Sequence, residues 1–112
     1  MNRRIFAFSL ALAVAGLVAP GLARAEDHLA EAIKHTQEAI EHGEKGHAKE
    51  LVKHAKVALT QAKAAEKASD NEHTKEGITH LNAAIAEGKK NKAEEATGHA
   101  KEALEHLQEA AK

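Results

Sequence analysis

The 112-residue sequence contains no cysteine, tryptophan or tyrosine, and only one proline and one methionine. Without cysteine, the chain can form neither a disulfide nor a thiolate metal site. All three arginines, both phenylalanines, the methionine and the proline fall within residues 1–25. Residues 26–112 therefore offer no guanidinium groups to pair with phosphates and no Phe, Tyr or Trp rings to stack on bases, which argues against nucleic-acid binding.

The scarce residues at the N-terminus belong to the pattern of a secretory signal peptide. Arg3 and Arg4 form a positive start, residues 5–19 are apolar but too short for a confident membrane span, and Ala23-Arg24-Ala25 resembles a cleavage motif. We predict a signal peptide over residues 1–25 and one domain over residues 26–112, exported to the bacterial periplasm and free of the membrane after cleavage. An uncleaved membrane anchor is the alternative.

Residues 26–112 have the composition of α-helices. Good helix formers dominate, and no run of alternating β-branched residues occurs. Breakers separate four predicted helices, at about residues 26–42, 47–67, 72–87 and 91–112. Short connections favour antiparallel neighbours, so the predicted fold is all-α, an up-down-up-down four-helix bundle.

The predicted helix ends rest on local signals. We interpret Gly43 and Gly88 as the residues that end the first and third helices. Ser69 or Asp70 is the expected N-cap of the third helix, in a capping box with Glu72, and Asn91-x-x-Glu94 is a similar start for the fourth.

The two halves of the domain resemble each other. Residues 28–43, HLAEAIKHTQEAIEHG, align with residues 73–88 at an offset of 45, and GHAKELVKH (46–54) aligns with GHAKEALEH (98–106) at an offset of 52. We interpret the domain as a duplicated helical hairpin with one heptad inserted in the second copy. Seven residues are about two helical turns, so an insertion of that length preserves the helix phase.

The phase of the apolar residues predicts where the histidines lie. Apolar or small residues recur at alternating steps of four and three, as at Leu29, Ile33, Thr36 and Ile40, and equivalent seams run through the other helices. All nine histidines occupy one position relative to this seam, about 130° from its centre. We therefore expect them on the solvent side of the helices rather than in the core.

Each predicted helix contains the motif H-x-x-E-x-x-x-H. Residues three or four apart on a helix are neighbours, with about 5–6 Å between Cβ atoms, whereas histidines seven apart are separated by about 10.5 Å. The motif therefore predicts a series of two-ligand His–Glu clips rather than one closed cage. The candidate metal ligands are His28, Glu31, His35, Glu38, His42, His47, Glu50, His54, His73, Glu76, His80, His99, Glu102, His106 and Glu109.

Folding each hairpin about its loop places the histidines in four pairs of equal height, namely His42 with His47, His35 with His54, His80 with His99, and His73 with His106. Height alone does not determine whether the paired rings face each other, and His42 with His47, beside a tight loop, is the favoured pair. Cleavage after Ala25 would also create an amino terminus with His28 in third place, which suits square-planar Cu(II) or Ni(II).

Imidazole and carboxylate ligands suit Cu(II), Ni(II), Zn(II) and Co(II), and the general affinity order favours Cu(II). Binding requires neutral imidazole, so it is expected to weaken below about pH 6.5. Residues 26–112 hold only twelve Leu, Ile and Val. We therefore expect a marginally stable bundle whose melting temperature rises when metal binds.

Taken together, the N-terminal signal, the heptad-spaced histidines, the GHAKE segments and the chain length resemble the small metal-binding proteins of bacterial periplasms. The resemblance covers the whole of residues 26–112. It implies a monomeric four-helix bundle that binds several divalent ions, copper foremost, in copper storage, buffering or detoxification.

Two other classes of function were weighed against metal binding. We predict no enzyme, because residues 26–112 lack cysteine, contain a single serine in a loop, and place their histidines toward water. The remaining alternative is a helical module that binds a protein partner, with the histidines incidental.

Overall fold

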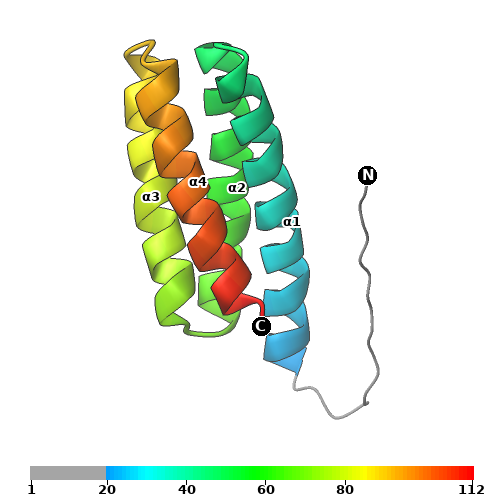
Figure 1. Ribbon diagram of the computed structural model, residues 1–112. Helices are drawn as coiled ribbons and strands as arrows, with labels where there is room; N and C mark the ends of the chain where they lie inside the picture. The colour runs from blue at the N-terminus through cyan, green and yellow to red at the C-terminus, as the bar shows by residue number, and fades with distance from the viewer. Residues whose placement is uncertain (1–19) are drawn as a thin grey trace.

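The structure is a computed structural model that describes residues 20–112. Its four helices are α1 (Pro20–Glu44), α2 (Ala48–Ala68), α3 (Glu72–Lys89) and α4 (Ala93–Ala110), and each runs antiparallel to the next (Figure 1). α1 packs against α2 and α3 against α4, and the two hairpins close through the α2–α3 and α1–α4 contacts. The predicted all-α four-helix bundle is confirmed.

The predicted signal peptide lies largely outside the described residues. Residues 1–19 hold its positive start and its apolar stretch, while the Ala23-Arg24-Ala25 motif lies in the first turns of α1. Among residues 20–112, every helix is too short or too polar to cross a bilayer.

The two tight loops share one geometry. Gly46 and Asn91 adopt the left-handed conformation, with φ of 80° and 65°. The amide of the following residue donates to a carbonyl five residues back, from His47 to His42 and from Lys92 to Glu87. This is a Schellman motif, in which the left-handed residue lets the chain satisfy the last carbonyls of the helix. The helix-ending residues are therefore Gly46 and Asn91, and the prediction of Gly43 and Gly88 was wrong.

The equivalent loops also correct the predicted insertion. α1 ends at Glu44 and α3 at Lys89, while α2 begins at Ala48 and α4 at Ala93, so both boundaries are 45 residues apart. No heptad is therefore inserted at the loop of the second hairpin, and that prediction was wrong. Instead, the GHAKE segment of α4 lies about two turns farther from its loop than the GHAKE segment of α2 does.

The N-cap of α3 is Asn71, not Ser69 or Asp70. Its backbone is extended, and its side-chain oxygen accepts hydrogen bonds from the amides of His73 (2.8 Å) and Thr74 (3.3 Å). α4 has Lys92 at the capping position, with no side-chain cap. Asn91, predicted as a cap of α4, instead provides the left-handed residue after α3 because asparagine tolerates that conformation better than most residues.

The core is rotated relative to the predicted seam. Leu29 and Thr36 are buried as expected, but Ile33 and Ile40 are only half-buried, whereas Ala32 and Ala39 are fully buried. The same shift occurs in the other helices, and twelve of the seventeen buried hydrophobic residues are alanine. Alanine permits close helix approach, so the bundle closes over its smallest side chains. The histidines lie beside these alanines, so the same rotation of each helix places them next to the helix–helix seams.

Close approach of the helices leaves no room for a side chain at Gly43. A Cβ on Gly43 would lie 2.0 Å from Thr97 Oγ1 and 2.6 Å from Leu51 Cδ1, whereas a Cβ on Gly98 would meet nothing within 4 Å. We expect Gly43→Ala to lower the free energy of unfolding by about 1–3 kcal/mol through overpacking. Gly98→Ala should raise it by about 0.5–1 kcal/mol, because alanine stabilises an exposed helix interior. Urea unfolding of both variants checks this, and equal effects would contradict the described packing.

An ion-pair cluster joins α2 to α3. Lys75 Nζ lies 2.8 Å from Asp70 Oδ1 and 3.7 Å from Glu66 Oε2. The contact between Asp70 and Lys75 lowers the pKa of Asp70 and raises the pKa of Lys75. Burial raises the pKa of Glu66.

The Asp70–Lys75 pair should stabilise the fold only when both groups are charged. A lowered aspartate pKa contributes stability above its usual 3.8, and that stability is lost as pH falls through the folded value. The raised lysine pKa contributes below its usual 10.5 and is lost at higher pH. Lys75→Met should therefore lower the melting temperature at neutral pH but not at about pH 2. A difference that persists at the acid pH would show that lost packing, not charge, causes it.

Candidate metal-binding site

The four histidine pairs of equal height all face each other across a seam. In the α1/α2 hairpin, the ring centroids of His35 and His54 are 5.8 Å apart and those of His42 and His47 are 6.2 Å apart. In the α3/α4 hairpin, the corresponding distances are 5.7 Å for His73–His106 and 5.9 Å for His80–His99.

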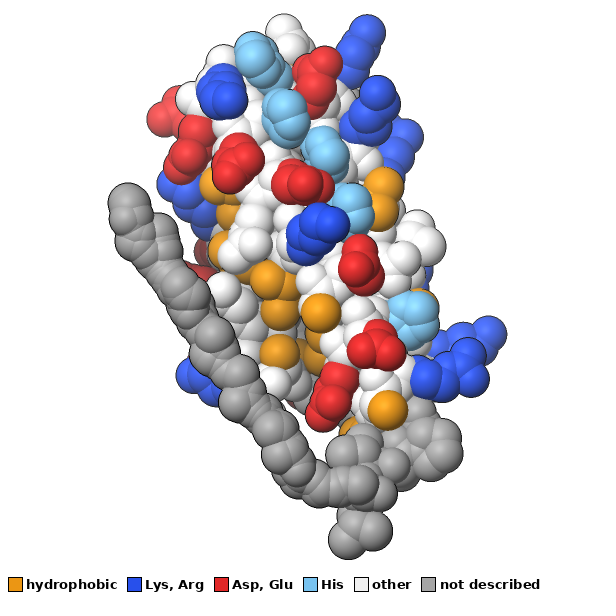
Figure 2. All heavy atoms as spheres, turned by 90° about the vertical axis from the view of Figure 1, so that its right-hand side faces the viewer, with side chains coloured by type: hydrophobic (Ala, Val, Ile, Leu, Met, Phe, Trp, Pro, Cys, Tyr) orange, Lys and Arg blue, Asp and Glu red, His pale blue; other side chains and the backbone are white. Residues whose placement is uncertain are grey.

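Diagonal contacts join these pairs into two continuous histidine rows. His42 stacks on His54 at 5.1 Å, and His80 stacks on His106 at 5.5 Å, with the ring planes nearly parallel in both cases. The α1/α2 row therefore contains, in order, His47, His42, His54 and His35. The α3/α4 row contains, in order, His99, His80, His106 and His73. Figure 2 shows histidines aligned along one face of the bundle, with acidic side chains beside them.

Most of the rings are half-buried rather than turned to solvent, while His47 and His73 are exposed. The side chains of His35, His54 and His80 are 23%, 27% and 27% exposed. The expectation of solvent-side histidines was therefore wrong in degree, because the rotated core brings these positions to the edge of each seam.

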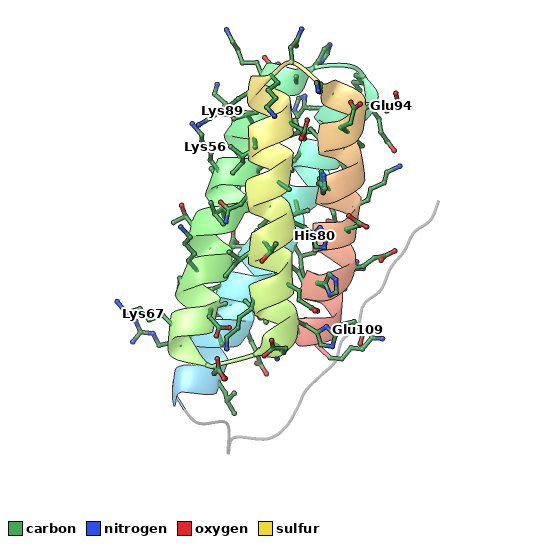
Figure 3. The ribbon with its side chains drawn as sticks, turned by 90° about the vertical axis from the view of Figure 1, so that its left-hand side faces the viewer. Lys56, Lys67, His80, Lys89, Glu94 and Glu109 are labelled. Carbon is green, nitrogen blue, oxygen red and sulfur yellow. The ribbon has the colours of Figure 1, made fainter. Side chains whose placement is uncertain are left out.

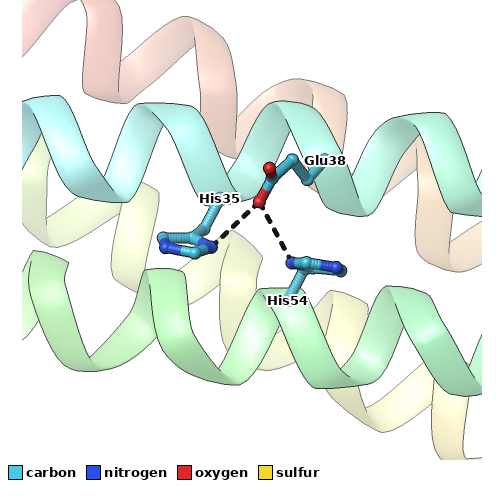
Figure 4. A group of neighbouring side chains, drawn as sticks. All are labelled: His35, Glu38 and His54. Atoms are coloured by element: carbon cyan, nitrogen blue, oxygen red, sulfur yellow. Dashed lines mark ion pairs between the residues drawn. The ribbon is translucent and has the colours of Figure 1, made fainter.

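Three groups each combine two histidines from facing helices with one carboxylate, and the ligand atoms of each group lie within 4.8 Å of one another. In the first group, Glu38 Oε1 lies 3.1 Å from His35 Nδ1 and 3.2 Å from His54 Nδ1, so one carboxylate oxygen of α1 bridges both helices (Figure 4). All three side chains of this group are half-buried.

The α3/α4 hairpin contains the other two groups. Glu76 Oε1 lies 3.0 Å from His106 Nδ1 and 3.7 Å from His73 Nδ1, and the two Nδ1 atoms are 3.4 Å apart.

In the third group, Glu102 Oε1 lies 3.2 Å from His80 Nδ1 and 3.6 Å from His99 Nδ1. His80 belongs to the line of side chains between α3 and α4 (Figure 3). Because His80 stacks on His106, the second and third groups are immediate neighbours.

This geometry suits a small divalent ion. Two adjacent ligand atoms that are each about 2.1 Å from one ion lie about 3.0 Å apart in a square arrangement and about 3.4 Å apart in a tetrahedral one. The shortest nitrogen–oxygen distances in the three groups, 3.1, 3.0 and 3.2 Å, are close to that spacing.

Several of the ligand atoms are also left without a hydrogen-bond partner. Among the described residues, His35 Nδ1, Glu38 Oε1, His42 Nδ1 and His99 Nδ1 are buried yet make no well-oriented hydrogen bond. Buried polar atoms normally have partners, and cations bound in the first and third groups would satisfy those of His35, Glu38 and His99. His42 belongs to none of the three groups.

Some predicted ligands lie outside the three groups. His28 Nδ1 is 2.7 Å from Gln61 Oε1, and Glu31 approaches His35 Nε2 only at 3.8 Å. His42 and His47 face each other but have no carboxylate within the same group. Glu109 Oε2 is 2.8 Å from Lys112 Nζ, a contact that lowers the pKa of Glu109.

Glu50 also lies outside the groups, so the two-ligand clips predicted within single helices are only partly realised. The sharing of carboxylates between helices was not predicted from the sequence. One further contact does follow from the sequence, because the reflection that pairs His35 with His54 also pairs His28 with Gln61.

Comparison with known proteins assigns the chain to a family. No curated protein gives a significant match. A family model described as "Small metal-binding protein" matches residues 2–110, which is nearly the whole chain. The match agrees with the convergence of imidazole and carboxylate ligands in both hairpins, and the chain therefore belongs to the small metal-binding protein family.

Proposed function

We propose that this protein binds several divalent metal ions along its two histidine rows, prefers Cu(II), and stores or buffers copper in the periplasm. The observation that carries the proposal is the convergence of two imidazoles and a shared carboxylate in three places. Family membership supports metal binding itself. The predicted signal peptide supports the periplasmic location.

The ligand chemistry favours copper among the borderline divalent ions. Imidazole nitrogens with a carboxylate oxygen suit Cu(II), Ni(II), Zn(II) and Co(II), and affinity for such ligands generally peaks at Cu(II). The chain has no cysteine, so the thiolate ligands that favour Cu(I) are absent.

Storage fits the position of the groups better than catalysis does. The ligand side chains of all three groups are half-buried or exposed. Ions can therefore enter and leave the groups without opening the bundle. We propose no enzymatic role, since each group presents only metal ligands and no enclosed space for a substrate.

Competition titrations test the preference for copper. We expect the metal-free protein at neutral pH to bind more than one Cu(II), and Cu(II) to displace bound Ni(II), Zn(II) and Co(II). Isothermal titration calorimetry measures stoichiometry and affinity for each ion. A variant with all nine histidines changed to glutamine is the control, and equal copper binding by that variant would refute the proposal.

A further inference from the structure

The five lysines of α2 form one stripe along its outer surface. They are Lys49, Lys53, Lys56, Lys63 and Lys67. At 100° per residue they fall within an arc of about 80°, and at 1.5 Å per residue they extend over roughly 27 Å. All five are exposed, and none forms an ion pair with another described residue.

The stripe continues onto the end of α3. Lys89 follows Gly88, whose backbone packs against Val52 and Ala48 of α2. Figure 3 shows Lys56, Lys67 and Lys89 on the α2 side of the bundle, and Glu94 and Glu109 on the α4 side. We call the five lysines of α2 together with Lys89 the basic face.

The other hairpin shows that the bundle does not require these lysines. The positions 45 residues further on have the same place relative to the loop, since the helix boundaries are offset by 45. Those positions are Glu94, Gly98, Lys101 and Gln108 in α4 and Lys112 just after it. The position 45 residues before Lys89 is Glu44. The equivalent face of the other hairpin therefore carries two lysines and two glutamates, with no net charge, whereas the basic face carries six lysines.

We propose that the basic face adsorbs the protein to the headgroups of an anionic phospholipid bilayer. A straight row of unpaired ammonium groups matches a plane of negative charge, and each lysine near such a surface contributes about fivefold in binding. Arginine forks and Phe, Tyr or Trp rings are absent from residues 26–112, so the contact is electrostatic and does not insert.

The net negative charge of residues 26–112, with 13 lysines against 17 aspartates and glutamates, averages over two unlike faces. Glu94 and Glu109 lie on the opposite edge of the bundle, away from a membrane bound at α2. On α2 itself, His54 lies about 140° around the helix from Lys49. The adsorbed protein therefore keeps the α1/α2 histidine row open to solution.

Vesicle co-sedimentation of the metal-free protein tests this proposal independently of metal binding. We expect the protein to sediment at moderate ionic strength with vesicles of phosphatidylcholine and phosphatidylglycerol, but not with phosphatidylcholine alone. The triple variant Lys49→Gln/Lys56→Gln/Lys63→Gln should lose about a hundredfold in affinity, since each charge contributes about fivefold. Circular dichroism confirms that the variants fold.

The matched control removes three lysines outside the basic face, in Lys34→Gln/Lys101→Gln/Lys112→Gln, and should lose much less. Equal losses in both triple variants would overturn the proposal, because they would reflect net charge alone. Failure of the protein to sediment with the anionic vesicles would also overturn the proposal. Self-association abolished by the basic-face variant, without vesicle binding, would instead identify a second copy as the partner.

Discussion

Replacing the four histidines of the α3/α4 row with glutamine should abolish two metal sites, whereas the same change in the α1/α2 row should abolish one. The α3/α4 row supplies the groups around Glu76 and Glu102, and the α1/α2 row supplies only the group around Glu38. Each variant loses four histidines. A protein that bound metal in proportion to its histidine count would lose equally from both changes.

The expected loss at each disrupted group exceeds about a hundredfold in affinity, because even the loss of a supporting hydrogen bond costs 10- to 100-fold. Equilibrium dialysis against Cu(II) at neutral pH, followed by metal analysis, gives the stoichiometry of each variant. The replaced side chains lie at the edges of the seams, so circular dichroism should show unchanged helix content. Equal stoichiometry in the two variants would contradict the described grouping.

Leu51→Ala should produce the largest loss of stability. Leu51 is fully buried, and its two methyl groups lie next to Gly43 of α1 and Gly88 of α3, so it fills space between both hairpins. Truncating a buried leucine costs about 2–5 kcal/mol. In a domain of this size each kcal/mol corresponds to about 4–8 °C in melting temperature. The alanine-rich core leaves little other apolar surface to compensate.

Val57, which is 40% exposed on the same helix, provides the control. Val57→Ala should change the free energy of unfolding by no more than about 0.5 kcal/mol. Thermal unfolding followed by circular dichroism measures both variants, with and without Cu(II). Metal should restore part of the loss in Leu51→Ala, by about 2.7 kcal/mol per site at a free concentration a hundred times the dissociation constant. Equal losses in the two variants would contradict the placement of Leu51.

Local sequence signals predicted the helices but not their caps. Three of the helices lie close to the predicted ranges, because helix-forming composition and breakers act over short distances, whereas α1 begins at Pro20, six residues before its predicted start. The choice among Ser69, Asp70 and Asn71 depends on which side chain can reach the free amides once the chain has turned, and only Asn71 does. In the same way, Asn91 is a plausible cap by type but occupies the left-handed position of a Schellman motif.

The sequence by itself determined that the chain is helical, that its four helices alternate in direction, and that the histidines recur at one phase and at matching heights. These properties follow from helix periodicity and short connections. Only the tertiary structure decided which way the histidines point. The helices close over Ala32, Ala39 and their counterparts, because small side chains allow closer packing than Ile33 and Ile40 do. That rotation brings imidazoles of facing helices to a shared carboxylate, an arrangement that no single helix can form.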